Sequence, residues 1–478
     1  MQASKVILGV GITLTVLAVG IGWVIFPQLL QLKIKSQIRL EEGGDLFQRW
    51  VDIPVPIYMK VYFFNVTNPD DVKRGEKPIL DEVGPYVYQQ KRQRVVENIS
   101  VENDTISFRP KITYYFRADL SEGRLETDVM TLVDIPYAGV VHKAISLSPF
   151  TRSLIRDISL DYNKDLFMHR TVAELTFTGY FDPLMKDLAE LQGQELLPNN
   201  TFGIYYGKNG TAGDLMQIYS GVGDNTLFGE TISWKGDDML SFWDTDYCNM
   251  INGSDGSVFP PFVTRDRVLR IFSPDMCRSI YMNYHEDVEV LGVPGYRFIT
   301  PREVLEDPKV YPENKCYCTN PGDDLAGCAK AGVFYLAPCR KGAPVVVSWP
   351  HFYDGDESYV QQSVGLKPEQ EKHETFIVLE PNTGSLIKAS KRFQINVELK
   401  PTKHFPPMKK VKNMLMPILW ADESVQLNEE NAAMINGKLM KPVKIVTIGT
   451  WSTLGLGLVL ILIGALLLTR EEKGNFKG

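Results

Sequence analysis

The chain has 478 residues, of which 44% are hydrophobic and 23% are charged, with 51 basic and 58 acidic side chains. The formal net charge of −7 gives the chain no overall basic character of the kind that nucleic-acid-binding proteins carry. Its apolar content is too high for a disordered protein. A mean hydropathy of −0.12 excludes a transporter built from many membrane-spanning helices.

Two uncharged apolar segments, one near each end, are long enough to cross a bilayer. Residues 6–26 form the first, of about 21 residues, and residues 445–468 form the second, of about 24 residues. A signal peptide is the alternative for the first, but its apolar run is long, and the bulky stretch Trp23–Pro27 does not resemble a small-residue cleavage site. We therefore predict two transmembrane helices, and Ala18 and Gly22 have the small-xxx-small spacing of helix contacts.

The segment between the two spans, residues 27–444, carries the marks of an extracytoplasmic domain. Lysines flank both sides of the spans, so the positive-inside rule does not decide the orientation. All six cysteines and all the glycosylation sequons of the chain lie in this segment. We expect N-glycosylation at Asn65, Asn98, Asn103, Asn199, Asn209 and Asn252. The tails, residues 1–5 and 469–478, are then predicted to be cytosolic.

The six cysteines lie between Cys248 and Cys339, and their spacing favours disulfides over a zinc site. Paired C-x₂-C knuckles, which are typical of zinc sites, are missing. Cys316 and Cys318 are separated by one residue, so a bridge between them would close a strained ring and each should reach another partner. Six cysteines allow 15 connectivities, and this argument removes only some of them.

Strand-like stretches dominate the segment between the spans. Residues 56–65 and 106–117 are rich in aromatic and β-branched residues, and residues 374–380 and 386–399 flank a Pro-Asn-Thr-Gly turn. We expect one mixed α+β ectodomain, built mainly on an antiparallel β-sheet or barrel with short helices.

A helical region interrupts this pattern at residues 140–192. Ser148-Pro149 is a helix start, and apolar residues follow at helical spacing: Phe150, Leu154, Ile155, Ile158 and Tyr162. A second helical stretch is predicted from about Thr171 to Leu191, after a polar connection at residues 163–170. An ordinary amphipathic helix pair explains the pattern fully, and a basic, partly apolar recognition surface is the alternative.

Motifs of catalysis are missing. The six histidines are scattered, and the chain has neither a zinc-protease His-Glu-x-x-His, nor a Gly-x-Ser-x-Gly elbow, nor a phosphate-binding loop. We predict no enzyme, no bound metal and no cofactor.

Seven segments together resemble those of the class B scavenger receptors, the CD36 family, in the same order along nearly the whole chain. They are Tyr62–Pro69, Glu82–Tyr86, Arg170–Leu175, Cys248–Gly256, Cys277–Ser279, Pro350–Tyr353 and Lys391–Asn396. The resemblance implies an antiparallel β-barrel ectodomain with a helical bundle at its membrane-distal apex and a hydrophobic tunnel. It also implies the disulfides Cys248–Cys316, Cys277–Cys339 and Cys318–Cys328.

By this resemblance, the function is a cell-surface receptor that binds lipids, lipoproteins or polyanionic particles at its apex and transfers lipid to the membrane. An anionic ligand needs cations at the tunnel mouth, and the candidates are Lys164, His169, Arg170, Arg152 and Arg156. A protein ligand at the apex is a further possibility.

The chain departs from the family in its tails. Neither tail has a cysteine for palmitoylation, and residues 469–478 lack the acidic dileucine signal of the lysosomal member. We therefore expect the plasma membrane, with an endosomal or lysosomal cargo receptor as the alternative. An adhesion or phagocytic receptor, or a chemosensory coreceptor, without bulk lipid transfer, stays open as well.

Overall fold

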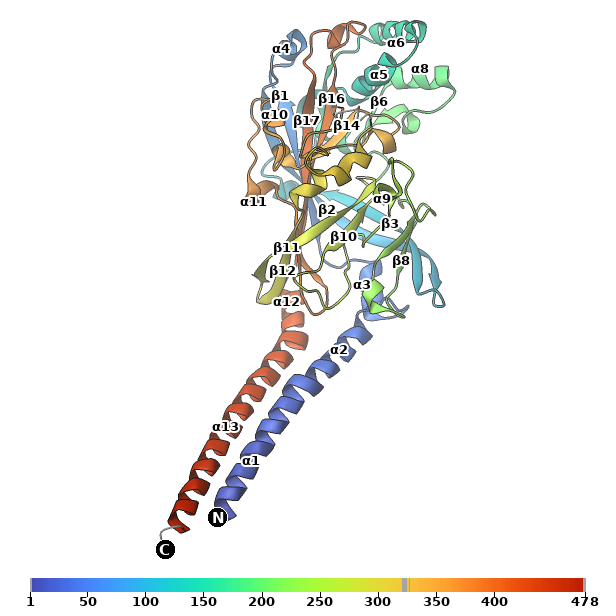
Figure 1. The fold of residues 1–478 in the computed structure, drawn as a ribbon. Helices are drawn as coiled ribbons and strands as arrows, with labels where there is room; N and C mark the ends of the chain where they lie inside the picture. Colours follow the sequence, from blue (N-terminus) through green and yellow to red (C-terminus); the bar gives the residue numbers. More distant parts are fainter. Residues whose placement is uncertain (1, 320–324, 326, 476–478) are drawn as a thin grey trace. The chain divides into compact units, whose positions relative to one another are not determined.

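The computed structural model describes residues 2–319, 325 and 327–475, and these form two compact units (Figure 1). One unit consists of residues 1–39, 289–295 and 427–478, and the other of residues 40–288 and 296–426. We call them the helical unit and the sheet unit. Residue 1 and residues 476–478, the ends of the two predicted tails, lie outside the described residues.

The helical unit contains two long apolar helices, each able to cross a membrane by its length and composition. The first runs through α1 (Gln2–Val19), a π-helical segment (Gly20–Ile25) and α2 (Phe26–Gln37). The second runs through α12 (Glu429–Ile435), a π-helical segment (Asn436–Met440) and α13 (Lys441–Asn475).

The apolar segment of residues 6–26 is followed by Pro27, and the helix continues past this proline to Gln37. Proline has no N–H to donate, and the π-helical turn just before it already departs from the α-helical hydrogen-bond pattern. The two helices pack through small residues: a Cβ added at Gly22 would lie 2.2 Å from Thr450 Oγ1, and one added at Gly11 would lie 2.7 Å from the backbone nitrogen of Ile461.

The sheet unit is built on one large, nearly closed antiparallel sheet, as predicted. Within the described residues the sheet has thirteen strands, ordered β10-β11-β12-β15-β16-β17-β1-β2-β3-β8-β9, with β14 pairing β16 and β13 pairing β14. The predicted strands 56–65, 106–117 and 386–399 are confirmed as β1, β3 and β16, and residues 374–380 contain β15.

The strands of this sheet are β1 (Ile57–Val66), β2 (Leu80–Ser100), β3 (Thr105–Phe116), β8 (Met216–Tyr219), β9 (Thr231–Trp234), β10 (Leu269–Ser273), β11 (Arg278–Val290), β12 (Val293–Ile299), β13 (Val333–Tyr335), β14 (Val345–Ser348), β15 (Phe376–Leu379), β16 (Leu386–Leu399) and β17 (Met414–Gln426). Two small sheets pair β4 (Val129–Val133) with β5 (Phe167–Thr171) and β6 (Tyr180–Phe181) with β7 (Thr201–Phe202).

Several helices gather at one end of the sheet unit, which we call the helical end (Figure 1). The start of β1 and the end of β17 lie together, because the two strands are antiparallel neighbours with Tyr58 opposite Ser424. The helical end is the opposite end of these strands. Its helices are α4 (Pro69–Arg74), α5 (Ile135–Ile145), α6 (Pro149–Asp161) and α8 (Pro183–Gln192). Elsewhere the unit has α3 (Asp45–Val51), α7 (Val172–Thr176), α9 (Asp246–Asn249), α10 (Glu357–Val360) and α11 (Gln370–His373).

The predicted helix start at Ser148 is confirmed, because its hydroxyl caps α6 by accepting from the backbone N–H of Thr151 at 3.2 Å. The single helix predicted from Thr171 to Leu191 is wrong. Gly179, with a positive φ of 69°, and Pro183 interrupt it, so the stretch divides into α7, β6 and α8.

Three disulfides join Cys248 to Cys316, Cys277 to Cys339 and Cys318 to Cys328, and no described cysteine is free. These are the pairs that the resemblance implies. The first two tie the segment around α9 and β10 to the irregular chain before β13 and to the turn after it, and the third closes a short loop before β13.

Three of the seven segments that carry the family resemblance are connected by contacts within the sheet unit. The rings of Tyr62 and Trp420 stack at 4.1 Å between centroids, and Glu82 accepts hydrogen bonds from Trp420 and from His351 Nε2. His351 in turn stacks on His373 at 4.5 Å. These contacts join β1, β2, β17 and the segment around His351 within the sheet unit.

Candidate ligand-binding surface

Lys164, the first of the five predicted ligand-binding cations, lies inside an ion triad at the helical end. Its ammonium group lies 2.7 Å from Asp182 Oδ2 and 3.1 Å from Asp134 Oδ2. The Lys164 side chain is 13% exposed, and that of Asp182 is fully buried. The two carboxylates also cap helices, Asp134 at α5 and Asp182 at α8. Burial raises the pKa of Asp134 against the opposing effect of the ammonium group. Lys164 thus joins two helix starts and offers little surface to a ligand.

Arg152 and Arg156 both lie on α6 and are both engaged. The Arg152 guanidinium donates to His404 Nε2 at 2.9 Å and to the backbone carbonyls of Ala144, Ile145 and Leu147. It therefore fixes the turn between α5 and α6. Arg156 pairs with Asp157 at 2.7 Å on the exposed side of the helix.

His169 and Arg170 lie on β5, away from α6 in the chain. His169 Nδ1 forms a hydrogen bond of 2.9 Å with the Thr131 hydroxyl on β4. The Arg170 guanidinium lies 4.4 Å from the Tyr180 ring centroid and 3.9 Å from Glu174. Each of the five predicted cations therefore has a partner within the sheet unit.

The helical end also exposes large apolar side chains. The sequence pattern placed Phe150, Leu154 and Tyr162 on the apolar stripe of α6, but only Ile155 of that stripe is fully buried. Phe150 is 80% exposed. The exposed apolar residues of this end are Phe150, Leu154, Leu160, Tyr162, Phe181 and Leu191. Large exposed apolar groups rimmed by polar residues are typical of contact surfaces for lipids or proteins.

The sequence analysis missed the loop between β16 and β17, residues 400–413, which lies at the same end. This loop carries five lysines and one histidine and has no acidic residue. Arg152 contacts it through His404, whose pKa is lowered by partial burial and by the neighbouring charges of Arg152 and Lys403. A count of charged residues along the chain would have found this segment, because it holds five lysines and no acidic residue.

A second group of charges lies on a face of the large sheet. Glu423 on β17 pairs with Arg92 on β2 at 2.7 Å and with Lys391 on β16 at 3.7 Å. Although burial alone would raise the pKa of Glu423, the two cations and Gln90 lower it to about 2. Lys391 also reaches Asp275 at 3.4 Å.

Half-buried aromatic rings lie near these charges. Lys391, Phe393 and Ile395 alternate along β16 and therefore share one face. Phe177 lies 4.7 Å from Tyr114 on β3 and 5.4 Å from Tyr205, measured between ring centroids. All five apolar residues named here pack against the main core while keeping part of their surface accessible.

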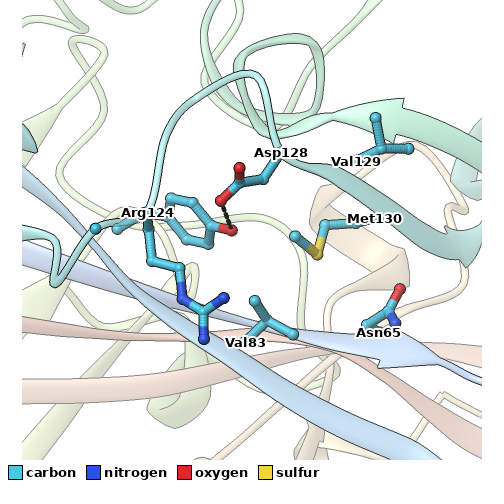
Figure 2. A pocket seen from close by; sticks show the side chains of 8 residues that line it. Asn65, Val83, Arg124, Asp128, Val129 and Met130 are labelled. Carbon is cyan, nitrogen blue, oxygen red and sulfur yellow. Dashed lines mark hydrogen bonds between the residues drawn. The ribbon is translucent and has the colours of Figure 1, made fainter.

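A polar pocket of about 330 Å³ lies beside the predicted glycosylation site Asn65 (Figure 2). Its floor includes Tyr86, whose hydroxyl donates to Asp128 at 2.9 Å, and the side chain of Arg124 extends along one wall. Because this pocket is lined largely by polar groups, it does not have the character of a lipid tunnel.

The six sequon asparagines differ in exposure. Asn98, Asn103, Asn199 and Asn209 are exposed, and Asn65 and Asn252 are half-buried. Asn65 Oδ1 accepts from the backbone N–H of Thr131 at 2.8 Å, and Asn209 Oδ1 accepts from that of Tyr114 at 2.9 Å. Glycosylation at these sites stays a prediction.

Among the described residues, no group of three His, Cys, Asp or Glu side chains is arranged to hold a metal ion.

The fold and the surface define a class: a two-pass membrane protein whose large disulfide-bonded sheet unit presents a basic and apolar end. The model of the CD36 family matches residues 9–468. Lysosome membrane protein 2 of Rattus norvegicus is 34% identical, covering 95% of this chain and 92% of that protein. Scavenger receptor class B member 1 of Mus musculus is 31% identical, and the match covers 99% of this chain and 92% of that protein. Sensory neuron membrane protein 2 of Manduca sexta is 32% identical, and the match covers 85% of this chain and 82% of that protein. The chain therefore belongs to the CD36 family of class B scavenger receptors.

Proposed function

We propose that this chain is a receptor that binds lipids, lipoproteins or anionic particles at its helical end and passes lipid through the interior of the sheet unit to the membrane. Both termini are cytosolic in this proposal, the sheet unit is glycosylated and extracellular, and the chain resides in the plasma membrane. No catalytic step is involved.

One observation carries the lipid-transfer step: the half-buried apolar face that includes Phe393 and Ile395 on β16 and Tyr114 on β3. An acyl chain gains about 0.8 kcal/mol for each methylene group that leaves water. The partly accessible apolar side chains on this face of a nearly closed sheet would give such a chain apolar contacts out of water.

The test is an uptake assay on cells that express the full chain, with different labels on the particle's lipid and on its protein. We expect lipid to enter while particle protein stays outside. The variant Ile395→Trp narrows the proposed path, so we expect at least a fivefold lower lipid uptake with particle binding unchanged. Val95→Trp, at an exposed position of β2, is the matched control.

Entry of both labels together would instead indicate a phagocytic receptor, and binding without entry an adhesion or chemosensory role. Equal lipid uptake by Ile395→Trp and the wild type would contradict the proposed path.

A lysosomal cargo receptor is the second candidate, favoured by the 34% identity to lysosome membrane protein 2 over 95% of this chain. Steady-state location separates the two candidates. Mostly intracellular protein that colocalises with a lysosomal marker would support the second candidate.

A further inference from the structure

The polar pocket beside β1 is lined by an asparagine that a glycan can join. Asn65 shares the pocket with residues of β2, of β4 and of the connection that precedes β4 (Figure 2). Its Oδ1 atom accepts from the backbone N–H of Thr131 at 2.8 Å, whereas its Nδ2 atom has no hydrogen-bond partner among the described residues. An N-linked glycan is attached at Nδ2. The first sugar of a glycan at Asn65 therefore starts at the wall of the pocket.

Attachment of a glycan leaves the contact between Asn65 and β4 intact. One of the two Nδ2 hydrogens is replaced by carbon 1 of the sugar, and the diphosphate of the lipid-linked sugar donor leaves. Oδ1 takes no part in this exchange, so it still accepts from Thr131. Asn209 differs, because its Nδ2 already donates to the Tyr114 carbonyl at 3.4 Å.

Two charged groups on the walls of the pocket are left unsatisfied by the protein. The Arg124 guanidinium has neither a hydrogen-bond nor an ion-pair partner in the described part of the chain. Asp128 Oδ2 accepts from the Tyr86 hydroxyl at 2.9 Å and from the Leu125 N–H at 3.1 Å. Its Oδ1 atom has no partner among the same residues. The pocket thus offers free donors and a free acceptor that do not pair with each other.

This combination fits an amino sugar. N-acetylglucosamine carries carbonyl and hydroxyl oxygens that can accept from Arg124, and N–H and hydroxyl groups that can donate to Asp128. Val83 and Val129 give its C–H groups apolar contacts. The volume of about 330 Å³ lies near the lower limit of ligand sites, about 300 Å³, which suits a sugar ring. An anion alone would pair with Arg124 but would face the Asp128 carboxylate.

We propose that the first N-acetylglucosamine of a glycan on Asn65 occupies this pocket, where it accepts from Arg124 and donates to Asp128. The docked sugar joins β1 to β4 and to residues 123–128, so it is part of the fold of the sheet unit. This inference rests on the glycosylated, extracellular sheet unit of the proposed function, and it gives one of the predicted glycans a defined binding site.

The test follows the release of glycans from the folded chain. The full chain is made in cultured animal cells, purified in detergent and treated, without denaturation, with a peptide-N-glycosidase. This enzyme hydrolyses the bond between Nδ2 and the sugar and leaves aspartate, which mass spectrometry detects at each site. A hydrogen bond to a charged group contributes roughly tenfold to an equilibrium, so two such bonds should protect the linkage strongly. We expect release at Asn65 to be at least tenfold slower than at the exposed Asn199.

The variant Arg124→Met removes the donors and keeps most of the side-chain length. Arg124 is exposed and has no partner to lose, so the variant should fold as the wild type does. Release at Asn65 should become about tenfold faster, with release at Asn199 unchanged. Arg49→Met changes an exposed arginine of α3 that does not line the pocket, and this matched control should keep both wild-type rates.

Equal release at Asn65 and Asn199 in the folded wild type would overturn the proposal. So would slow release at Asn65 that Arg124→Met does not change, because the half-buried linkage would then be protected without the pocket. An unmodified Asn65 in a chain that carries glycans at other sequons would overturn it as well, but would leave the extracellular placement intact. A chain without glycans at any of the six sites would contradict that placement too.

Discussion

Lys164 was predicted from the sequence to bind a ligand, but in the structure it forms an ion triad with Asp134 and Asp182. Its charge is balanced by two buried carboxylates that also cap α5 and α8. Removing one partner of a buried ion pair leaves the others uncompensated, which is costly.

We predict that Lys164→Met lowers the stability of the detergent-solubilised chain by about 3–5 kcal/mol, because Asp134 and Asp182 then lose their cation. Thermal unfolding measures this loss. Arg156→Met removes an exposed pair and should cost no more than about 1 kcal/mol. A Lys164→Met protein with wild-type unfolding temperature and lost particle binding would show that Lys164 is a ligand contact instead.

His373 is the second residue whose setting predicts a measurable property. It is buried against His351 and Trp420, and its Nδ1 accepts from the backbone N–H of Glu369 at 2.8 Å. Burial, followed by the nearby His351, lowers its pKa from 6.5 to about 4. Glu82, which accepts from His351, has a pKa below its usual 4.5.

Because unfolded His373 binds a proton near pH 6.5 and folded His373 only near pH 4, the unfolded state holds more protons between these values. Stability should therefore fall as the pH drops from about 6.5 to about 4, by about 2 kcal/mol at pH 5. Thermal unfolding of His373→Gln at pH 7 and pH 5 should show a smaller difference than the wild type.

Glu82 acts in the same direction, but only below about pH 4.5, so it does not obscure this window. His285→Gln, at an exposed position, is the control and should keep the wild-type difference. An unchanged pH dependence in His373→Gln would contradict the prediction.

At the scale of elements, the two apolar helices of the helical unit contact each other at glycines that lie on one face of each helix. Gly11, Gly457 and Gly464 each face backbone or side-chain atoms of the opposite helix within 3 Å of an added Cβ. Gly9, two residues from Gly11, has nothing within 4 Å of its added Cβ.

We predict that Gly11→Leu separates the helices, whereas Gly9→Leu leaves them packed, because only the first places a side chain in the contact. The rings of Trp23 and Trp451 lie 5.5 Å apart, so cysteines at these two positions report the contact by cross-linking in membranes. Cross-linking should fall at least fivefold with Gly11→Leu and stay unchanged with Gly9→Leu. Equal cross-linking in both would exclude the glycine contact.

Some elements could be predicted from the local sequence pattern, and others could not. The alternation and turn chemistry of residues 374–399 predict the hairpin of β15 and β16, because its register follows from neighbouring residues. The stretch 171–191 has a helical composition, but Gly179 and the pairing of Tyr180 with Phe202 impose a strand within it. That pairing partner lies outside any local window, so periodicity alone could not reveal the break.

At the scale of the whole molecule, the proposed receptor depends on the near closure of the sheet. Residues as distant in the chain as Arg92 and Glu423 meet on one face because β17, β1 and β2 are neighbours in the sheet order. The half-buried aromatic rings near them come from several strands and loops, so the proposed path for lipid would be a property of the assembled unit alone. The uptake assay with Ile395→Trp therefore tests the assembled sheet rather than one side chain.

The sequence by itself determined the two apolar spans, the confinement of cysteines to one segment, the strand-rich composition and the family, because each of these is written in local composition or in contiguous motifs. Only the tertiary structure decided which cations are available. Charge is a property of each residue, but its availability depends on neighbours. Carboxylates 18 and 30 residues away engage Lys164, and His404, 252 residues away, contacts Arg152, while the lysines at 403, 409, 410 and 412 stay exposed. Such pairings join residues far apart in the chain, and they exist only once the chain has folded.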